Sequence, residues 1–365
     1  MEYNNSIKAF LELVRTGLWG KNLDLRIDET TDWQEVYRLA TEQAVHGLVL
    51  AGLEHSDVKP PKMLLLQWIG EVQQIEQRNK TMNLFVAELV EKMRAADIYT
   101  VLVKGQGVAQ CYERPLWRPS GDVDFLLSEE NYKKAKAFLL PLSSGNKEEE
   151  RYSQHLGMNI GQWYVEIHGT LRTGLAARVD RQVDAVQRGV FYGGNVRPWM
   201  VQGSRFKVQG EETAKDVQVF LPAPTEDVFL VFTHFIKHFY KEGMSMRQLC
   251  DWCRLLWTYR NEIKVDWLEK YVRKAGLMKE WQAFAALAVE YMGMPAEAMP
   301  FINLDNDYLN QKVDKLVEFI LGGYSRNKVK DTKQIAKIFP WKALRYAPSI
   351  FLNVNWLKIR ERLFN

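Results

Sequence analysis

The first hundred residues carry apolar positions at helical spacing. Asp32 is a suitable N-cap for a helix whose apolar side extends over residues 36–50. A proline pair at 60–61 interrupts the chain, and apolar residues then recur every three or four positions over residues 65–93. Such a continuous stripe is typical of a long helix that faces a core. The pattern therefore predicts helices over residues 5–96.

The period changes in the next segment. Residues 99–103 are β-branched and aromatic and predict a buried strand, and residues 122–127 predict a second one. Ser128 is placed to cap a helix over residues 129–140. Between the strands, a short helix through Tyr112 leads into a loop with two prolines.

Two more strands are predicted at residues 151–160 and 163–168. In the second, apolar and polar residues alternate, which places Glu166 and His168 on one face and Ile167 on the other. A polar helix near 178–190 and short strands near 204–209 and 216–221 complete this region. These strands and helices occupy the middle of the chain.

After residue 225 the pattern is helical again, with separate helices expected at 265–275, 278–293 and 308–322. The tail over residues 328–365 is basic and aromatic, and we interpret it as a docked amphipathic helix rather than a membrane or nucleic-acid surface. We therefore expect an α+β protein with a central mixed β-sheet. The expected domains are a helical region (1–96), a sheet-containing catalytic domain (97–222) and a C-terminal helical domain (223–365).

Composition is that of an ordinary globular protein. The chain has 365 residues, 47% of them hydrophobic and 26% charged, and a formal net charge of +4. This mild excess fits a small polyanionic ligand without requiring nucleic acid. The three cysteines have no disulfide framework spacing, and Cys250 and Cys253 fit a helix face better than a redox or zinc motif. Neither a signal peptide nor an apolar run of roughly 18 residues is seen, so we expect a cytoplasmic protein without a membrane span.

The most informative motif is Gly121-Asp122-Val123-Asp124-Phe125. On a strand, Asp122 and Asp124 project from the same face while Val123 points to the other. Two adjacent carboxylates repel each other and are costly to bury, and a divalent cation removes that cost. Because Mg²⁺ binds carboxylate oxygens together with substrate phosphates, the motif suggests phosphoryl chemistry.

Two neighbouring segments strengthen this interpretation. The predicted strand at 99–103 ends in Lys104-Gly105-Gln106-Gly107, where glycine allows backbone N–H groups to approach an anion and Lys104 adds a positive charge. Glu166 provides a third carboxylate on another strand.

This combination resembles the nucleotidyltransferase superfamily related to DNA polymerase beta. Within it, the chain is most similar to a bacterial family of uncharacterised nucleotidyltransferases. The resemblance covers roughly residues 35–260, and the following segments carry it: Leu102–Gly105, Arg118–Leu127, Val165–His168, the pair His234 and His238, and Gln248–Trp252. One departure is Gln106, which stands where the superfamily has serine or glycine.

The resemblance implies Mg²⁺-dependent transfer of a nucleoside monophosphate from a nucleoside triphosphate to a hydroxyl group, with release of pyrophosphate. Two Mg²⁺ ions, with Mn²⁺ as the alternative, would be held by Asp122, Asp124 and Glu166, and Glu166 would serve as a metal ligand or as the base for the acceptor hydroxyl. The acceptor would be a small molecule, a protein or RNA. The residues implied in nucleotide and phosphate binding are Lys104, Gly105, Gln106, Arg118, Ser120, Gly121 and His238.

Several alternatives stay open on the sequence alone. Arg118 either neutralises the departing pyrophosphate or pairs with a structural carboxylate. His234 and His238 have the spacing of zinc ligands but no evident third ligand, so they line the cleft or belong to an ordinary helix surface. The whole protein is alternatively a catalytically idle nucleotide-binding or scaffold protein of a polysaccharide or toxin–antitoxin operon. An RNA-modifying transferase would need a strongly basic groove, which the net charge does not favour.

Overall fold

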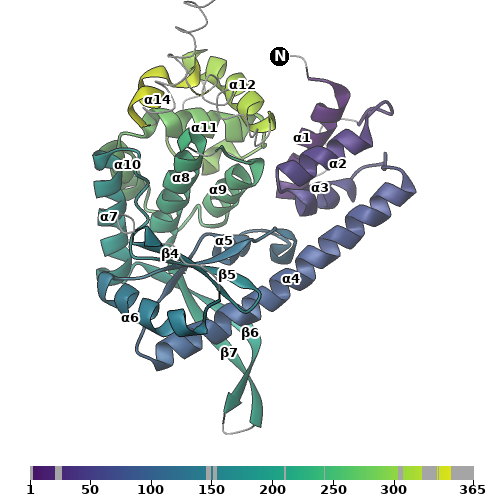
Figure 1. Ribbon diagram of the computed structural model, residues 1–365. Coiled ribbons are helices and arrows are strands. Elements are labelled where there is room, and N and C mark those ends of the chain that lie inside the picture. The colour runs from purple at the N-terminus through teal and green to yellow at the C-terminus, as the bar shows by residue number, and fades with distance from the viewer. Residues whose placement is uncertain are drawn as a thin grey trace, which may run out of the picture.

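The structure is a computed structural model of the chain. The residues that it describes are 3–20, 27–144, 149–150, 154–208, 211–241, 243–302, 307–322, 335 and 337–346. Helices dominate both ends of the chain and a mixed sheet lies between them, which confirms the predicted α+β class (Figure 1). Among the described helices, none combines the length and apolarity needed to cross a membrane.

The N-terminal part consists of four helices: α1 (Asn5–Trp19), α2 (Trp33–Glu42), α3 (His46–Leu53) and α4 (Lys62–Ala95). The side chain of Asp32 caps α2 by accepting from the backbone N–H groups of the first turn, as the sequence predicts. Figure 1 shows α4 as a long rod that runs diagonally beneath the sheet, with α1, α2 and α3 beside its first half.

One predicted helix is two helices in the structure. The apolar stripe over residues 36–50 suggested a single helix, but Ala44 has a φ of 53°, which ends the helical path. The side chain of Gln43 is buried at this break. It donates to the carbonyl of Ile320 and accepts from the backbone N–H of Met246. The break therefore lets the N-terminal helices bind the C-terminal ones, a long-range contact that local periodicity does not reveal.

The main sheet has five strands: β1 (Val101–Val103), β2 (Asp122–Leu126), β3 (Glu149–Glu150), β4 (His155–Ile160) and β5 (Trp163–His168). Their order is β1-β2-β5-β4-β3, and β2 and β5 are the parallel pair in an otherwise antiparallel arrangement. The apolar residues of β2 and β5 pack against α4 and α6. The opposite face of the same strands carries the carboxylates.

Short elements connect these strands: α5 (Gly105–Ala109), the 3-10 turns Pro115–Trp117 and Leu140–Leu142, and α6 (Glu129–Leu139). Ser128 caps α6 by accepting from the backbone N–H three residues later, which confirms the predicted helix start.

A long helix and a long hairpin follow the sheet: α7 (Ala177–Tyr192), β6 (Val196–Val208) and β7 (Glu211–Pro222). The hairpin strands are longer than the short segments predicted at 204–209 and 216–221. The base of the hairpin packs on the sheet and α4, whereas its far end extends away from the body (Figure 1). Polar residues toward that end interrupt the alternation of apolar and polar positions, so the sequence pattern underestimates the length of both strands.

The C-terminal part is helical, as predicted. Its described helices are α8 (Pro224–Lys241), α9 (Met246–Thr258), α10 (Val265–Ala275), α11 (Met278–Glu290), a 3-10 turn at Ala296–Ala298, α12 (Asp307–Leu321) and α14 (Pro340–Tyr346). They share one hydrophobic core with the N-terminal helices. Within the predicted tail of residues 328–365, Tyr346 is buried and Trp341 is 82% exposed, and residues 328–334, 336 and 347–365 lie outside the described part.

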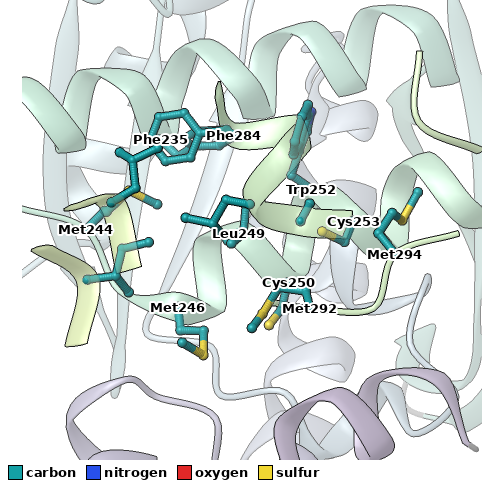
Figure 2. Packing of buried hydrophobic residues seen from close by; sticks show 14 of the residues in the cluster. Phe235, Met244, Met246, Leu249, Cys250, Trp252, Cys253, Phe284, Met292 and Met294 are labelled. Carbon is teal, nitrogen blue, oxygen red and sulfur yellow. The ribbon is translucent and has the colours of Figure 1, made fainter. Parts of the chain in front are cut away.

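Figure 2 shows how α9 fills the centre of this core. Cys250 and Cys253 lie among methionine and aromatic side chains, are fully buried and are not bonded to each other. Burial raises the pKa of both thiols well above the usual range. They therefore behave as small apolar residues, in agreement with the helix-face interpretation.

Candidate active site

The register of β2 and β5 brings three carboxylates together. Asp124 and Glu166 are direct partners across these parallel strands, and Asp122 is two residues away on the same face of β2. One oxygen of each carboxylate lies within 4.8 Å of an oxygen of the others. An all-oxygen group of this kind matches the ligand preference of Mg²⁺, so the donor set fits a divalent cation of that class.

Lys104 provides a positive charge inside this acidic group. It has a φ of 58°, and its Nζ lies 2.7 Å from Oδ1 of Asp124. Burial opposes ionisation of Asp124, but Lys104 and then His168 outweigh it and hold the pKa of the carboxyl below its usual value. Burial and the charge of Asp124 raise the pKa of Asp122 instead. The two aspartates are therefore electrostatically different.

Two histidines surround Glu166. The Nε2 atoms of His155 and His168 lie 3.2 and 3.4 Å from Oε2 of Glu166, and Nε2 of His168 is also 2.8 Å from Asp124. The two imidazole rings are stacked, with centroids 4.7 Å apart and an interplanar angle of 4°. Burial opposes the charged form of Glu166, but the two histidines outweigh it and keep its pKa well below the usual range.

These groups line a cavity of about 680 Å³ between the sheet, α8 and α9. Figure 1 shows α8 and α9 above the strands, on the side opposite to α4 and α6. The cavity lining is rich in positive charge away from the three carboxylates: Arg118, Arg172, Lys237, Lys241 and Arg247 line it, together with the acidic residues Asp227 and Asp251. An acidic floor and a basic wall suit a polyanion that is bound together with metal ions.

Arg118 lies at the edge of this cavity and pairs with a carboxylate of the protein. Its Nε and Nη2 donate to the two oxygens of Asp251 at 2.7 and 2.6 Å, and its Nη1 donates to Oγ of Ser120 at 3.1 Å. Tyr112 donates to the same carboxylate at 2.7 Å. Of the two roles considered for Arg118, the structure shows the structural pairing, which fixes the loop before Asp122 to α9.

The turn after β1 differs in part from the expected phosphate loop. Gly105 lines the cavity, but the side chain of Gln106 is 2% exposed and its Nε2 donates to the Sδ of Met82. Gln106 therefore points into the core and does not offer its amide to a phosphate in this arrangement. Gly107 allows close packing rather than anion contact, because a Cβ there would lie 2.8 Å from Leu221.

His234 and His238 both line the cavity from α8. Their Nε2 atoms are 3.1 Å apart, so one of the two rings donates to the other. Burial and then the charge of Lys104 lower the pKa of His234 well below its usual value. Among the described residues, neither histidine joins a group of three metal ligands. They form a polar patch on the cavity wall and, among the described residues, no zinc site.

Sequence reasoning missed part of the cavity wall. Arg172, Lys241 and Arg247 line it without having been singled out, and Arg172 is oriented by Asp184, with Nη2 2.7 Å from Oδ2. No spacing rule links these residues, since they come from the loop after β5, from α8 and from α9. The contact of His155 with Glu166 was foreseeable, because a two-residue turn at 161–162 sets the register of β4 and β5.

A comparison with models of protein families matches residues 29–293 to the family described as uncharacterised nucleotidyltransferase. The chain belongs to this family. The match extends beyond the predicted range of residues 35–260 at both ends and includes the carboxylate strands, α8 and α9. No curated protein and no solved structure matches the chain. Family membership supports nucleotidyl transfer as the general reaction, and the three carboxylates offer ligands for a metal ion.

Proposed function

We propose that this nucleotidyltransferase transfers a nucleoside monophosphate from a nucleoside triphosphate to a hydroxyl group of an acceptor, with Mg²⁺ or Mn²⁺ at Asp122, Asp124 and Glu166. The single observation that carries the proposal is the grouping of these carboxylates within 4.8 Å on the floor of a basic cavity. Ordinary surface acidic clusters lack that basic wall, and it supplies the charge that a triphosphate needs.

The residues of the chain have distinct tasks in this proposal. The basic wall orients the triphosphate, and Lys104 can move from Asp124 to a phosphate oxygen when a metal ion compensates the carboxylate. When bound, the metal ions neutralise the triphosphate and lower the pKa of the acceptor hydroxyl. The hydroxyl oxygen bonds to the α-phosphorus, the bond between that phosphorus and the bridging oxygen breaks, and pyrophosphate leaves with the electron pair.

Glu166 has two candidate roles in this reaction, as a metal ligand or as the base that takes the hydroxyl proton, and its surroundings support the first. A carboxylate whose pKa is held well below the usual range is a weak base. We therefore assign Glu166 as a metal ligand and route the hydroxyl proton to water. The acceptor stays a hydroxyl-bearing small molecule, protein or RNA.

The test is a melting-temperature panel of ATP, GTP, CTP and UTP, each with and without Mg²⁺, followed by detection of pyrophosphate. A ligand that binds only the native state stabilises it and raises the melting temperature. The stabilisation is about 2.7 kcal/mol when the free ligand is at a hundred times its Kd. We expect a metal-dependent shift in wild type and in Asp57→Asn, an exposed control, and none in Asp122→Asn. Absence of any shift contradicts the proposal, and a shift without pyrophosphate release on any acceptor favours the idle nucleotide-binding protein.

A further inference from the structure

Two histidines and one carboxylate meet on the cavity side of β4 and β5. His155 and His168 are direct partners across these antiparallel strands, and Glu166 follows on the same face opposite Gly157. Gly157 has no side chain, and the hydroxyl end of Tyr164 fills that position on β4, because its Oη would lie 2.0 Å from a Cβ there. The register of one hairpin therefore fixes the relative positions of all three groups.

The ligand atoms are close enough to share one ion. One nitrogen of each histidine and one oxygen of Glu166 all lie within 4.8 Å of one another. Both Nε2 atoms face the same oxygen of Glu166, at 3.2 and 3.4 Å. All three side chains line the cavity, so an ion can reach them from its interior.

The chemistry of this group differs from that of the neighbouring carboxylates. Imidazole nitrogen suits Zn²⁺, Fe²⁺ and Co²⁺, whereas Mg²⁺ prefers oxygen ligands. We propose that His155, Glu166 and His168 form a second cation site, which binds a divalent first-row transition metal next to the all-oxygen group. Glu166 belongs to both groups, and the two groups therefore compete for it or share it across two ions.

The proposal gives the two sides of the site different metal preferences. The Asp122 side takes Mg²⁺ or Mn²⁺, and the Glu166 side takes a transition metal through its imidazoles. The geometry of the three ligands supports the second metal site independently of any reaction. A part for that metal in catalysis, near the acceptor, rests on the proposed function.

The test uses the full chain, stripped of metal with a chelator and free of nucleotide. Calorimetric titration with Co²⁺ compares wild type with His155→Gln, with His55→Gln as an exposed histidine control and with Asp122→Asn. Removing a residue that only hydrogen-bonds to a metal ligand already weakens metal binding roughly 10- to 100-fold. His155→Gln removes a ligand itself, so its affinity for Co²⁺ should fall by at least that factor. His55→Gln should match wild type, and Asp122→Asn should keep Co²⁺ binding because Asp122 is outside the nitrogen group.

A second measurement does not depend on a variant that folds. Pulsed electron paramagnetic resonance of Co²⁺ bound to wild type at low temperature detects magnetic coupling to a directly bound imidazole nitrogen. Coupling supports the site. No coupling, together with equal Co²⁺ affinity in His155→Gln and His55→Gln, overturns it and leaves the nucleotide-dependent shift of the proposed function untouched. The reverse pattern, Co²⁺ binding that needs His155 but no nucleotide shift, keeps the metal site and rejects the proposed function.

Discussion

Lys104 and Asp124 form an ion pair at the centre of the carboxylate group, with Nζ 2.7 Å from Oδ1 and side chains only 20% and 2% exposed. The lysine thus compensates the most buried of the three carboxylates in the protein alone. A metal ion at the same carboxylate would take over that task and release the lysine. Under the proposed function, Lys104 and the metal ion would therefore be alternative partners of Asp124.

This relationship predicts the behaviour of Lys104→Met. Breaking a buried pair by removing one partner costs about 3–5 kcal/mol, because the other charge stays buried. We expect that loss in the free energy of unfolding without metal, and a larger stabilisation by Mg²⁺ than in wild type. Urea unfolding with and without Mg²⁺ measures both quantities.

The control for this prediction is Lys133→Met, which breaks an exposed pair with Glu129 on α6. Exposed helical pairs of this kind contribute about 0.3–0.5 kcal/mol, so this variant should stay close to wild type in both conditions. Equal stabilisation by Mg²⁺ in Lys104→Met and wild type would show that lysine and metal do not compete.

A second prediction concerns Arg118 and Asp251, whose side chains are 6% and 8% exposed. Asp251→Asn leaves the guanidinium without its carboxylate and should destabilise the fold by about 3–5 kcal/mol. The neighbouring pair of Arg114 and Glu54 has a similar two-bond geometry but is 42% and 49% exposed. Glu54→Gln should therefore cost no more than about 1 kcal/mol in the same urea experiment. Similar losses in both variants would contradict the structural role of Arg118.

The sequence predicts the acidic strand well because the relevant physics is local. The alternation in residues 163–168 places Glu166 on the polar face, and the i, i+2 spacing of Asp122 and Asp124 puts both on one side of β2. Short strands with apolar positions on one face leave little freedom for another orientation. The parallel register that pairs Asp124 with Glu166 is a tertiary feature, which the pattern of neither strand specifies on its own.

The partners of those residues depend on contacts that local patterns do not encode. Arg118 meets Asp251 across 133 positions of sequence, and neither residue type nor spacing distinguishes that partner from a phosphate. Gln106 was expected at the phosphates because it follows Gly105, but its side chain is buried and donates to the Sδ of Met82 on α4. Side-chain direction at this turn depends on the surrounding core, which the local sequence does not encode.

A third prediction is a pH dependence that comes from Asp227 on α8. The carboxylate lies 2.8 Å from Arg197, and burial, which outweighs that arginine, raises the pKa of Asp227 above its unfolded value. A raised folded pKa favours folding below the unfolded pKa of 3.8, and this contribution is lost as the pH rises through the folded pKa. Arg197→Gln should raise the pKa further. This variant should lower the free energy of unfolding by about 3–5 kcal/mol at pH 7. The loss relative to wild type should become smaller as the pH falls.

The double variant Arg197→Gln with Asp227→Asn provides the control. It contains no buried carboxylate at this position, so its deficit relative to wild type should be smaller at pH 7 and should depend less on pH. Unfolding measured in urea at several pH values between 7 and 4.5 gives the comparison. A deficit of Arg197→Gln that is constant over this range would place the loss in packing on Tyr259, whose ring lies 4.6 Å from the guanidinium, rather than in charge.

The last prediction separates the two aspartates of the motif, because opposite electrostatic environments surround them. Burial and the charge of Asp124 disfavour the charged form of Asp122 and raise its pKa, whereas Lys104 and His168 compensate the charge of Asp124. Without metal, Asp122→Asn should stabilise the protein by about 1–4 kcal/mol, the range for two unit charges 4 Å apart in water and near a protein surface. Asp124→Asn should destabilise it by about 3 kcal/mol, since Lys104 loses its partner. Both variants should lose the Mg²⁺-dependent nucleotide shift, so urea unfolding without metal distinguishes them while the nucleotide assay does not. Equal stability changes in the two variants would mean that Lys104 does not discriminate between the carboxylates.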